Sequence, residues 1–265
     1  MLVTLLLVPD DTDRDWESFA RTDPYWSVLS AEEFRNKNLT AESLDRFFHS
    51  GKAHVESMLD ILMSRFAAPK RFTVSLDFGC GVGRLLFPLA AVSEKSIGLD
   101  VSPTMLNLCR QHAEKRHIEN IELYQSDDDL SAISRHIGEV EVITSYIVFQ
   151  HISPRRGYRI FNNLLRLLKP GGVGCLHFTF AATIQSLQHE ADNVNGFLYG
   201  YYQRTSDGII KLVEYPAGDI QIQMNHYSLN ELYCYLYHNG VSDILARLTN
   251  HSNTIGAELF FRKPG

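Results

Sequence analysis

The stretch DFGCGVGR, residues 77–84, decides the fold, because it joins an apolar run to a helical pattern. Residues 74–78 form the apolar run, and Leu85, Leu86 and Leu89 follow with the spacing of one helix face. Glycines between a strand and a helix let a ligand approach the backbone, and the helix start offers free N–H groups. The loop therefore predicts a site for a nucleotide-like ligand that carries a carboxylate or a phosphate.

Strands and helices alternate downstream of this loop. Such alternation predicts βαβ units, and hence a parallel sheet with helices on both faces that binds its ligand at the carboxyl ends of the strands. A capping box from Ser228 to Glu231 starts a later helix, which ends at Gly240. We expect strands at residues 95–101, 121–125, 140–146 and 173–180, helices at 103–116 and from 153–154 to about 168, and a closing β-hairpin at 243–249 and 258–263.

The segment before the loop, residues 10–70, has helical periodicity. Thr40 is the expected N-cap of a helix over residues 41–49, and Ser50-Gly51 is expected to separate it from a second helix. That second helix carries an apolar stripe of Val55, Met58, Leu59, Leu62 and Phe66. The apolar residues 2–8 lack the flanks of a signal peptide, and we interpret them as a packed or frayed terminal segment.

Composition narrows the class of protein. The chain has 265 residues, with 25 Lys and Arg against 31 Asp and Glu, which gives a net charge of −6. This charge disfavours a nucleic-acid partner, and the lack of long apolar runs disfavours a membrane span. Four separate cysteines, with no CxxC pair, predict neither a disulfide framework nor a metal site, and fit a reducing cytoplasm.

The loop itself discriminates between nucleotide ligands. A Walker loop is excluded because no Gly-Lys-Ser/Thr follows, and the dinucleotide fingerprint is incomplete because Arg84 replaces its third glycine. Asp77 would repel a phosphate but attract an ammonium group. Asp100, 21 residues after Gly79, can accept both hydroxyls of a ribose, and one of residues 127–129 can accept a base's amino group. S-adenosylmethionine combines an ammonium, a carboxylate, a ribose and an amino-purine.

The sequence resembles the class I S-adenosylmethionine-dependent methyltransferases, in their small-molecule branch. Residues 76–84 resemble the first motif of that family and residues 97–102 the second, while residues 149–152 and 167–172 resemble segments that flank its fourth and fifth strands. The resemblance implies a Rossmann-like, doubly wound α/β fold with seven strands, mostly parallel, and an antiparallel last strand.

We expect one methyltransferase domain over the whole chain. Its parts would be an N-terminal helical cap (10–70), a cofactor-binding core (71–180), a substrate-side insert (181–226) and a closing helix and hairpin (227–265). The resemblance implies that S-adenosylmethionine is bound by Asp77, Gly79, Cys80, Gly81, Gly83, Arg84, Asp100, Val101, Asp127 or Asp128, and Tyr146.

His151, just beyond the fourth strand, is the candidate general base; a packing or capping role is the alternative. His177 lies within an apolar strand, which favours a core role. Aromatic residues in the cap and the insert are candidates for covering the site or contacting the substrate. The candidate substrate residues are Tyr25, Trp26, Tyr199, Tyr202 and His226.

The acceptor class is only partly constrained. The motif of amino-methylating DNA enzymes is missing after the fourth strand, and no Pro-Cys pair marks a cytosine C5 enzyme. We therefore expect methyl transfer to a small molecule, at oxygen, nitrogen or carbon. A non-catalytic S-adenosylmethionine-binding protein and an NAD-linked oxidoreductase are the two alternatives.

Overall fold

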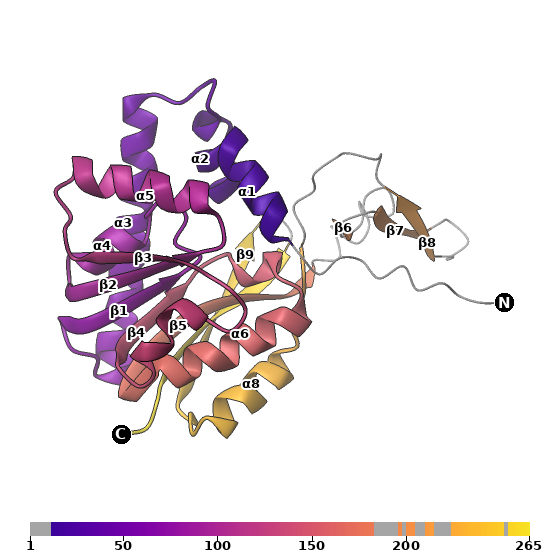
Figure 1. Cartoon of the computed structure of the whole chain (residues 1–265). Coiled ribbons are helices and arrows are strands. Elements are labelled where there is room, and N and C mark those ends of the chain that lie inside the picture. Colours follow the sequence, from indigo (N-terminus) through magenta and orange to yellow (C-terminus); the bar gives the residue numbers. More distant parts are fainter. Residues whose placement is uncertain (1–11, 183–195, 198–199, 205–209, 215–223, 252–253) are drawn as a thin grey trace.

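The computed structural model describes residues 12–182, 196–197, 200–204, 210–214, 224–251 and 254–265 (Figure 1). A central sheet contains β1 (Phe72–Phe78), β2 (Ser93–Asp100), β3 (Ile121–Gln125), β4 (Val140–Ser145), β5 (Leu168–Ala182), β9 (Ile244–His251) and β10 (Thr254–Arg262). A small second sheet contains β6 (Gly196–Phe197), β7 (Gly200–Arg204) and β8 (Ile210–Glu214), within the predicted insert.

The seven strands of the central sheet follow the order β3-β2-β1-β4-β5-β10-β9. The first five strands in this order are parallel to one another, and β10 is antiparallel to both β5 and β9. The predicted seven-stranded, mostly parallel sheet with an antiparallel last strand is therefore confirmed.

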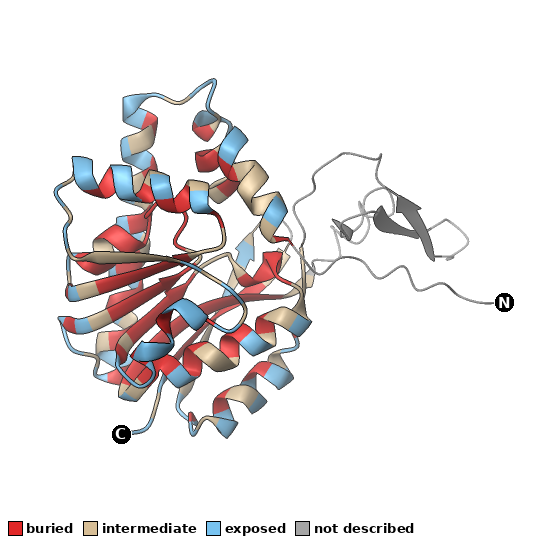
Figure 2. Cartoon of the chain, viewed as in Figure 1, coloured by how far each residue is buried: buried red, intermediate tan, exposed pale blue. Residues whose placement is uncertain are grey.

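Helices cover both faces of this sheet (Figures 1 and 2). On β10, Leu259 and Phe261 pack with α6 (Pro154–Leu167) and α8 (Leu229–His238), whereas Phe260 between them packs with α3 (Ala41–Phe66) on the other face. This alternation is the period of two that a strand buried on both faces requires. Two more helices, α4 (Leu86–Ala90) and α5 (Pro103–Lys115), pack together around Leu86, Cys109 and Ala113.

Helix α3 differs from its prediction, because it is one continuous helix and not two. Thr40 caps it as expected, with its side chain accepting a hydrogen bond from the Ser43 N–H. Ser50 and Gly51 lie inside the helix. A Cβ at Gly51 would lie 2.1 Å from the carbonyl oxygen of Arg84, so this glycine allows close packing against the loop after β1 and does not end the helix.

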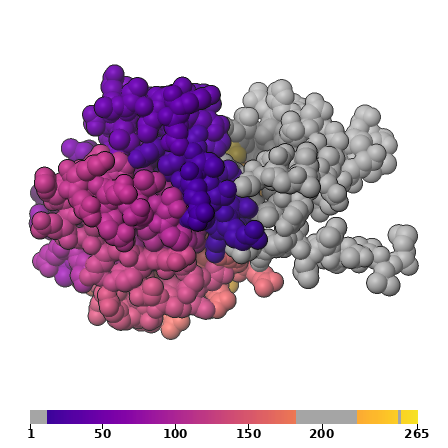
Figure 3. Space-filling model, turned by 45° about the horizontal axis from the view of Figure 1, so that its top comes forward, coloured from indigo at the N-terminus to yellow at the C-terminus, as the bar shows by residue number. Residues whose placement is uncertain are grey.

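The helices before α3 pack against the core near α5 (Figure 3). They are α1 (Asp13–Thr22), α2 (Pro24–Val28) and the short 3₁₀ helix η1 (Glu32–Phe34). Asp23 precedes α2 as its N-cap residue, and proline occupies the first helical position. Glu17 of α1 accepts hydrogen bonds from Ser102 and Thr104 at the start of α5, which holds the two helices together.

The antiparallel register of the last hairpin decides which of its residues reach the ligand-binding edge. Thr254, at the start of β10, pairs with Ala182 at the end of β5, and His251, at the end of β9, pairs with Thr254. These residues therefore lie at the carboxyl edge of the parallel strands. Within the described part of the chain, no helix has the length and apolar character needed to cross a membrane.

Candidate functional site

The glycine loop after β1 is held by backbone hydrogen bonds to β2. The N–H groups of Gly79 and Cys80 both donate to the carbonyl oxygen of Leu99, at 2.8 and 2.9 Å. Gly79 has a φ of +75°, and a Cβ there would lie 2.4 Å from Cγ2 of Val148. A side chain at this position would therefore be both strained and blocked, which explains the glycine.

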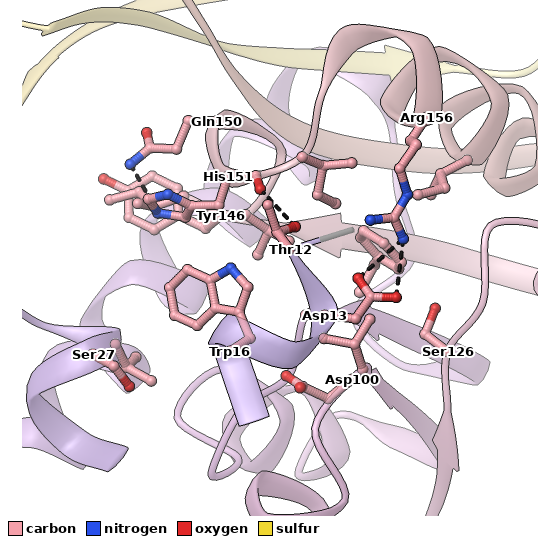
Figure 4. A pocket seen from close by; sticks show the side chains of 18 of the residues that line it. Thr12, Asp13, Trp16, Ser27, Asp100, Ser126, Tyr146, Gln150, His151 and Arg156 are labelled. Atoms are coloured by element: carbon pink, nitrogen blue, oxygen red, sulfur yellow. Dashed lines mark hydrogen bonds and ion pairs between the residues drawn. The ribbon is translucent and has the colours of Figure 1, made fainter. Parts of the chain in front are cut away.

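Asp100 ends β2 and braces the same loop. One carboxylate oxygen accepts a hydrogen bond from the Gly81 N–H at 2.8 Å, and the other from the Ser102 N–H at 2.9 Å. Burial raises the pKa of Asp100 to about 6, although these two hydrogen bonds act in the opposite direction. Each oxygen keeps further acceptor capacity, and the side chain lines the cavity described below (Figure 4).

Asp77 lies beneath the loop and is almost fully buried, at 1% exposure. Its Oδ2 has no hydrogen-bond partner among the described residues. Burial raises the pKa of Asp77 to about 7, while the nearby charge of Arg84 opposes that rise. A buried carboxylate oxygen without a donor is a feature that a bound ammonium group would satisfy.

A cavity of about 650 Å³ opens beside this loop, at the carboxyl edge of the sheet. The N-terminal helices, the segments after β1 to β4 and the β9–β10 hairpin all contribute to its walls. The lining includes Thr12, Asp13, Trp16, Ser27–Ser30, Gly79, Arg84, Asp100, Val101, Ser126–Asp128, Tyr146–Val148, Gln150–Ile152, Arg156, Met224, His251 and Thr254. The sequence analysis did not single out Trp16, Gln150, Arg156 or His251.

The acids after β3 have different partners. Asp127 accepts a hydrogen bond from the Ser131 N–H at 2.9 Å, and this bond and others lower its pKa although burial alone would raise it. Asp128 forms an ion pair of 2.8 Å with Arg156, and the same guanidinium reaches Asp13 of α1 at 3.0 Å (Figure 4). We call this trio, Asp13, Arg156 and Asp128, the α1 latch, because it joins α1 to the core beside the cavity.

His151 lies at the end of the 3₁₀ helix η3 (Phe149–His151) and lines the cavity. Its Nε2 is 3.1 Å from Nε2 of Gln150, and its ring lies 4.9 Å, between centroids, from the indole of Trp16. Its carbonyl oxygen accepts a hydrogen bond from the Thr12 hydroxyl (Figure 4). The segment after β4 and the N-terminal helix thus hold this imidazole at the wall of the cavity.

Several predicted residues lie away from this cavity. The hydroxyl of Tyr25 lies 2.6 Å from Nε2 of His112, and the guanidinium of Arg35 stacks on Trp26. Cys80 is buried against Cys109, behind the glycine loop, and hydrogen bonding to Cys109 together with burial holds its pKa well above the usual value. Asp77, Gly81, Gly83 and His226 do not line the cavity either, although Asp77 lies beneath the loop and Gly81 supports Asp100. Tyr199 lies outside the described residues, and so does the side chain of Tyr202.

Comparison with known proteins agrees with this geometry. Residues 76–172 match the family described as a methyltransferase domain. The carboxy-S-adenosyl-L-methionine synthases of Vibrio parahaemolyticus and Yersinia pestis are each 24% identical over 163 residues, which are 56% of this chain and 62% and 57% of those proteins. The chain thus aligns with about three fifths of the length of these curated relatives.

Two solved structures show the same fold. The magnesium protoporphyrin IX methyltransferase of Synechocystis PCC 6803, with bound S-adenosylhomocysteine, superposes with a TM-score of 0.62 at 16% identity, over 96% of this chain and 100% of that one. A phosphoethanolamine N-methyltransferase of Haemonchus contortus gives 0.59 at 14% identity, over 97% and 49%. The match over residues 76–172, the strand order and these two structures agree with one another: residues 76–172 match a methyltransferase domain, and the chain has the fold of these methyltransferases.

Proposed function

We propose that this protein transfers the methyl group of S-adenosylmethionine to a small-molecule acceptor held in the same cavity. The observation that carries the proposal is the composition of the cavity: a braced glycine loop and Asp100 lie at one wall, and the polar ring of His151 lies at another. The net charge of −6 supports a small molecule in preference to a nucleic acid.

The residues at the loop fit the cofactor. Asp77, with its unpartnered oxygen, would hold the ammonium of the methionine moiety, and Gly79 leaves room for that moiety to cross the loop. Asp100 would accept the ribose hydroxyls, and Val101 would lie beside the adenine. Asp127 is better placed than Asp128 to accept the adenine amino group, because Asp128 is already paired with Arg156.

The chemistry needs alignment and, for many acceptors, a base. The bound cofactor supplies an activated methyl group on a sulfonium, and the acceptor must approach that group in line. We assign proton acceptance to His151, because its ring is at the cavity wall and Gln150 and Trp16 fix its orientation. Trp16 of α1 also lines the cavity beside this ring.

Equilibrium dialysis with S-adenosylmethionine and S-adenosylhomocysteine tests whether the protein binds the cofactor. Transfer of a tritiated methyl group to a panel of alcohols, phenols, amines and carboxylic acids tests whether it methylates an acceptor. His151→Ala should lower turnover by about 10²- to 10⁴-fold with cofactor affinity unchanged, whereas His238→Ala, at an exposed site on α8, should change neither. Absence of cofactor binding would refute the proposal. Binding without transfer to any acceptor would favour a non-catalytic binding protein.

A further inference from the structure

A second wall of the cavity carries the rings of Tyr146 and His251, and two further rings, which do not line the cavity, pack against Tyr146. The Tyr146 hydroxyl, after β4, lies 3.2 Å from Nε2 of His251 on β9, and both side chains line the cavity. His54 of α3 packs on the Tyr146 ring with centroids 3.9 Å apart, and His177 of β5 lies 5.2 Å from it. We call these four residues the imidazole wall.

The imidazole wall is polar but carries no net charge near neutral pH. Burial lowers the pKa of His177 to about 3 and that of His54 to about 4, and it also lowers the pKa of His251. Burial raises the pKa of the Tyr146 phenol, which therefore keeps its proton. These four groups thus offer hydrogen-bond donors and acceptors and no formal charge.

Acidic and basic side chains lie around the imidazole wall. Glu258, at 2% exposure, forms an ion pair of 2.6 Å with Arg247 and lies 3.7 Å from His54. Arg156 is held in the α1 latch, whereas Arg84 lines the cavity near the charge of Asp77 but forms no ion pair among the described residues. A carboxylate or phosphate at this wall would be desolvated close to Glu258, whose Oε1 has no hydrogen-bond partner among the described residues, and the repulsion between the two anions is unfavourable.

We propose that the imidazole wall is the acceptor subsite, and that it selects an uncharged hydroxyl group, an alcohol or a phenol, over carboxylates, phosphates and ammonium groups. The inference rests on the proposed function and specifies its acceptor. A hydroxyl both donates and accepts one hydrogen bond, which matches the Tyr146–His251 pair. Tyr146 and His251 are positioning residues, while His151 remains the group that accepts the proton.

Two buried nitrogens support a polar ligand in this region. His54 Nε2 and His177 Nδ1 have no hydrogen-bond partner among the described residues. The other nitrogen of His177 is satisfied, because its Nε2 lies 2.8 Å from the Thr249 hydroxyl. Neither residue lines the cavity itself, but unpartnered polar atoms in a buried cluster are costly, and a water molecule between them and a bound hydroxyl group would reduce that cost.

Three probes of similar size separate the chemical classes: phenol, benzoate and benzylammonium. Their affinities would be measured by ligand-observed NMR on the full chain, with and without S-adenosylhomocysteine. We expect phenol to bind at least tenfold more tightly than either charged probe. Benzoate or benzylammonium binding as tightly as phenol would overturn the inference.

Variants of the two lining residues, compared with variants of exposed residues, test where phenol binds. Tyr146→Phe and His251→Gln should each weaken phenol binding about 3- to 10-fold, the effect of losing one neutral hydrogen bond. Tyr233→Phe and His238→Gln change exposed residues of α8 and should leave phenol binding unchanged. Unchanged affinity in both wall variants would refute the assignment.

Nitrogen-15 NMR of the histidines gives a second readout that needs no variant. Phenol should shift the resonances of His251 and leave those of His238 in place; the absence of such a shift would count against the subsite. S-adenosylhomocysteine binding is measured on the same samples. Its failure would refute the proposed function, whereas failure of phenol alone would refute only the acceptor class.

Discussion

The two walls of the cavity are built in different ways. The cofactor wall comes mainly from the glycine loop, Asp100 and Val101, with Asp77 beneath it, and hydrogen bonds of the loop's backbone N–H groups to Leu99 and Asp100 hold it together. The imidazole wall comes from α3, β5, β9 and the segment after β4, and ring contacts hold it together. The first wall carries buried carboxylates, and the second carries neutral rings. A local motif therefore fixes the cofactor, whereas long-range packing shapes the space for the acceptor.

Gly79→Ala should have the largest effect on the cofactor wall. The new Cβ would adopt an unfavourable φ and collide with Val148, so we expect a loss of about 2–5 kcal/mol in unfolding free energy, together with loss of cofactor binding. Chemical denaturation and calorimetry with S-adenosylhomocysteine would measure both quantities.

Gly138→Ala is the matched control for Gly79→Ala. Gly138 has a φ of +76°, close to that of Gly79, but a Cβ there meets no atom within 4 Å. Its cost should be limited to about 1–2 kcal/mol of backbone strain, with cofactor affinity preserved. Equal losses in the two variants would mean that backbone strain, and not the close packing of the loop, explains Gly79.

Asp100→Ala should have the second-largest effect on the cofactor wall. It removes the acceptor of two backbone hydrogen bonds and the proposed ribose contact, which predicts about 1.5–3 kcal/mol weaker cofactor binding, or about 10- to 150-fold. Calorimetry would measure the affinity. Asp129→Ala, which removes an exposed acid paired with Arg159, should bind the cofactor like the unmodified protein. Equal affinities for Asp100→Ala and Asp129→Ala would remove Asp100 from the site.

The raised pKa of Asp77, about 7, predicts a pH dependence of the cofactor wall. The carboxyl is mostly protonated at pH 6 and mostly ionised at pH 8, and only the ionised form attracts an ammonium group. Affinity for S-adenosylhomocysteine should therefore rise by up to about tenfold from pH 6 to pH 8. Asp77→Asn should flatten this profile. A profile that persists in the variant would assign the dependence to another group.

Asp77 and Asp100 also contribute to the stability of the free protein, and their contribution changes with pH in the opposite direction to the cofactor affinity. The folded state binds protons at Asp77 and Asp100 more tightly than the unfolded state does, because both pKa values are raised from 3.8. Between about pH 4 and 7 these two carboxyls therefore lower the free energy of unfolding as pH rises, whereas His54 and His177, whose pKa values are lowered from 6.5, act in the opposite direction up to about pH 6.5. The difference in unfolding free energy between Asp77→Asn and the unmodified protein, measured without cofactor across this range, isolates the contribution of Asp77, which should fall as pH rises.

Asp13→Asn should have the smallest effect, because it weakens the α1 latch without touching either wall directly. Partly exposed ion pairs contribute at most about 1 kcal/mol, so cofactor affinity should fall no more than about fivefold and dissociation should become faster. Stopped-flow measurement of dissociation would detect the change. A loss larger than that of Asp100→Ala would make the latch, and not the ribose acid, the main determinant of the cofactor wall.

The sequence was informative where structure is local. The glycine loop, Asp100 and the alternation of strands and helices all depend on short segments whose pattern is visible along the chain. His251 was not found, because its place at the cavity depends on the antiparallel register of β9 and β10, and no local pattern encodes that register. Pairing the two strands of the predicted hairpin residue by residue could have suggested that His251 lies near the cavity.

The same distinction explains the error in α3. A Ser-Gly pair usually marks a break between helices, and the sequence offers no sign of the carbonyl oxygen of Arg84 that makes a glycine necessary at position 51. Arg156 was missed for a similar reason: its partners, Asp13 and Asp128, lie 143 and 28 residues away along the chain. Contacts of this kind require the folded arrangement.

The thiol behind the glycine loop gives the molecule a built-in reporter. Cys80, Cys109 and Cys175 are buried and only Cys234 is exposed, so an alkylating reagent can modify one cysteine in the native state and three only after local opening. The modification rate of Cys80 then measures how often the loop detaches from β2. A ligand that stabilises the loop would slow that reaction and could be detected by mass spectrometry, without knowledge of the acceptor.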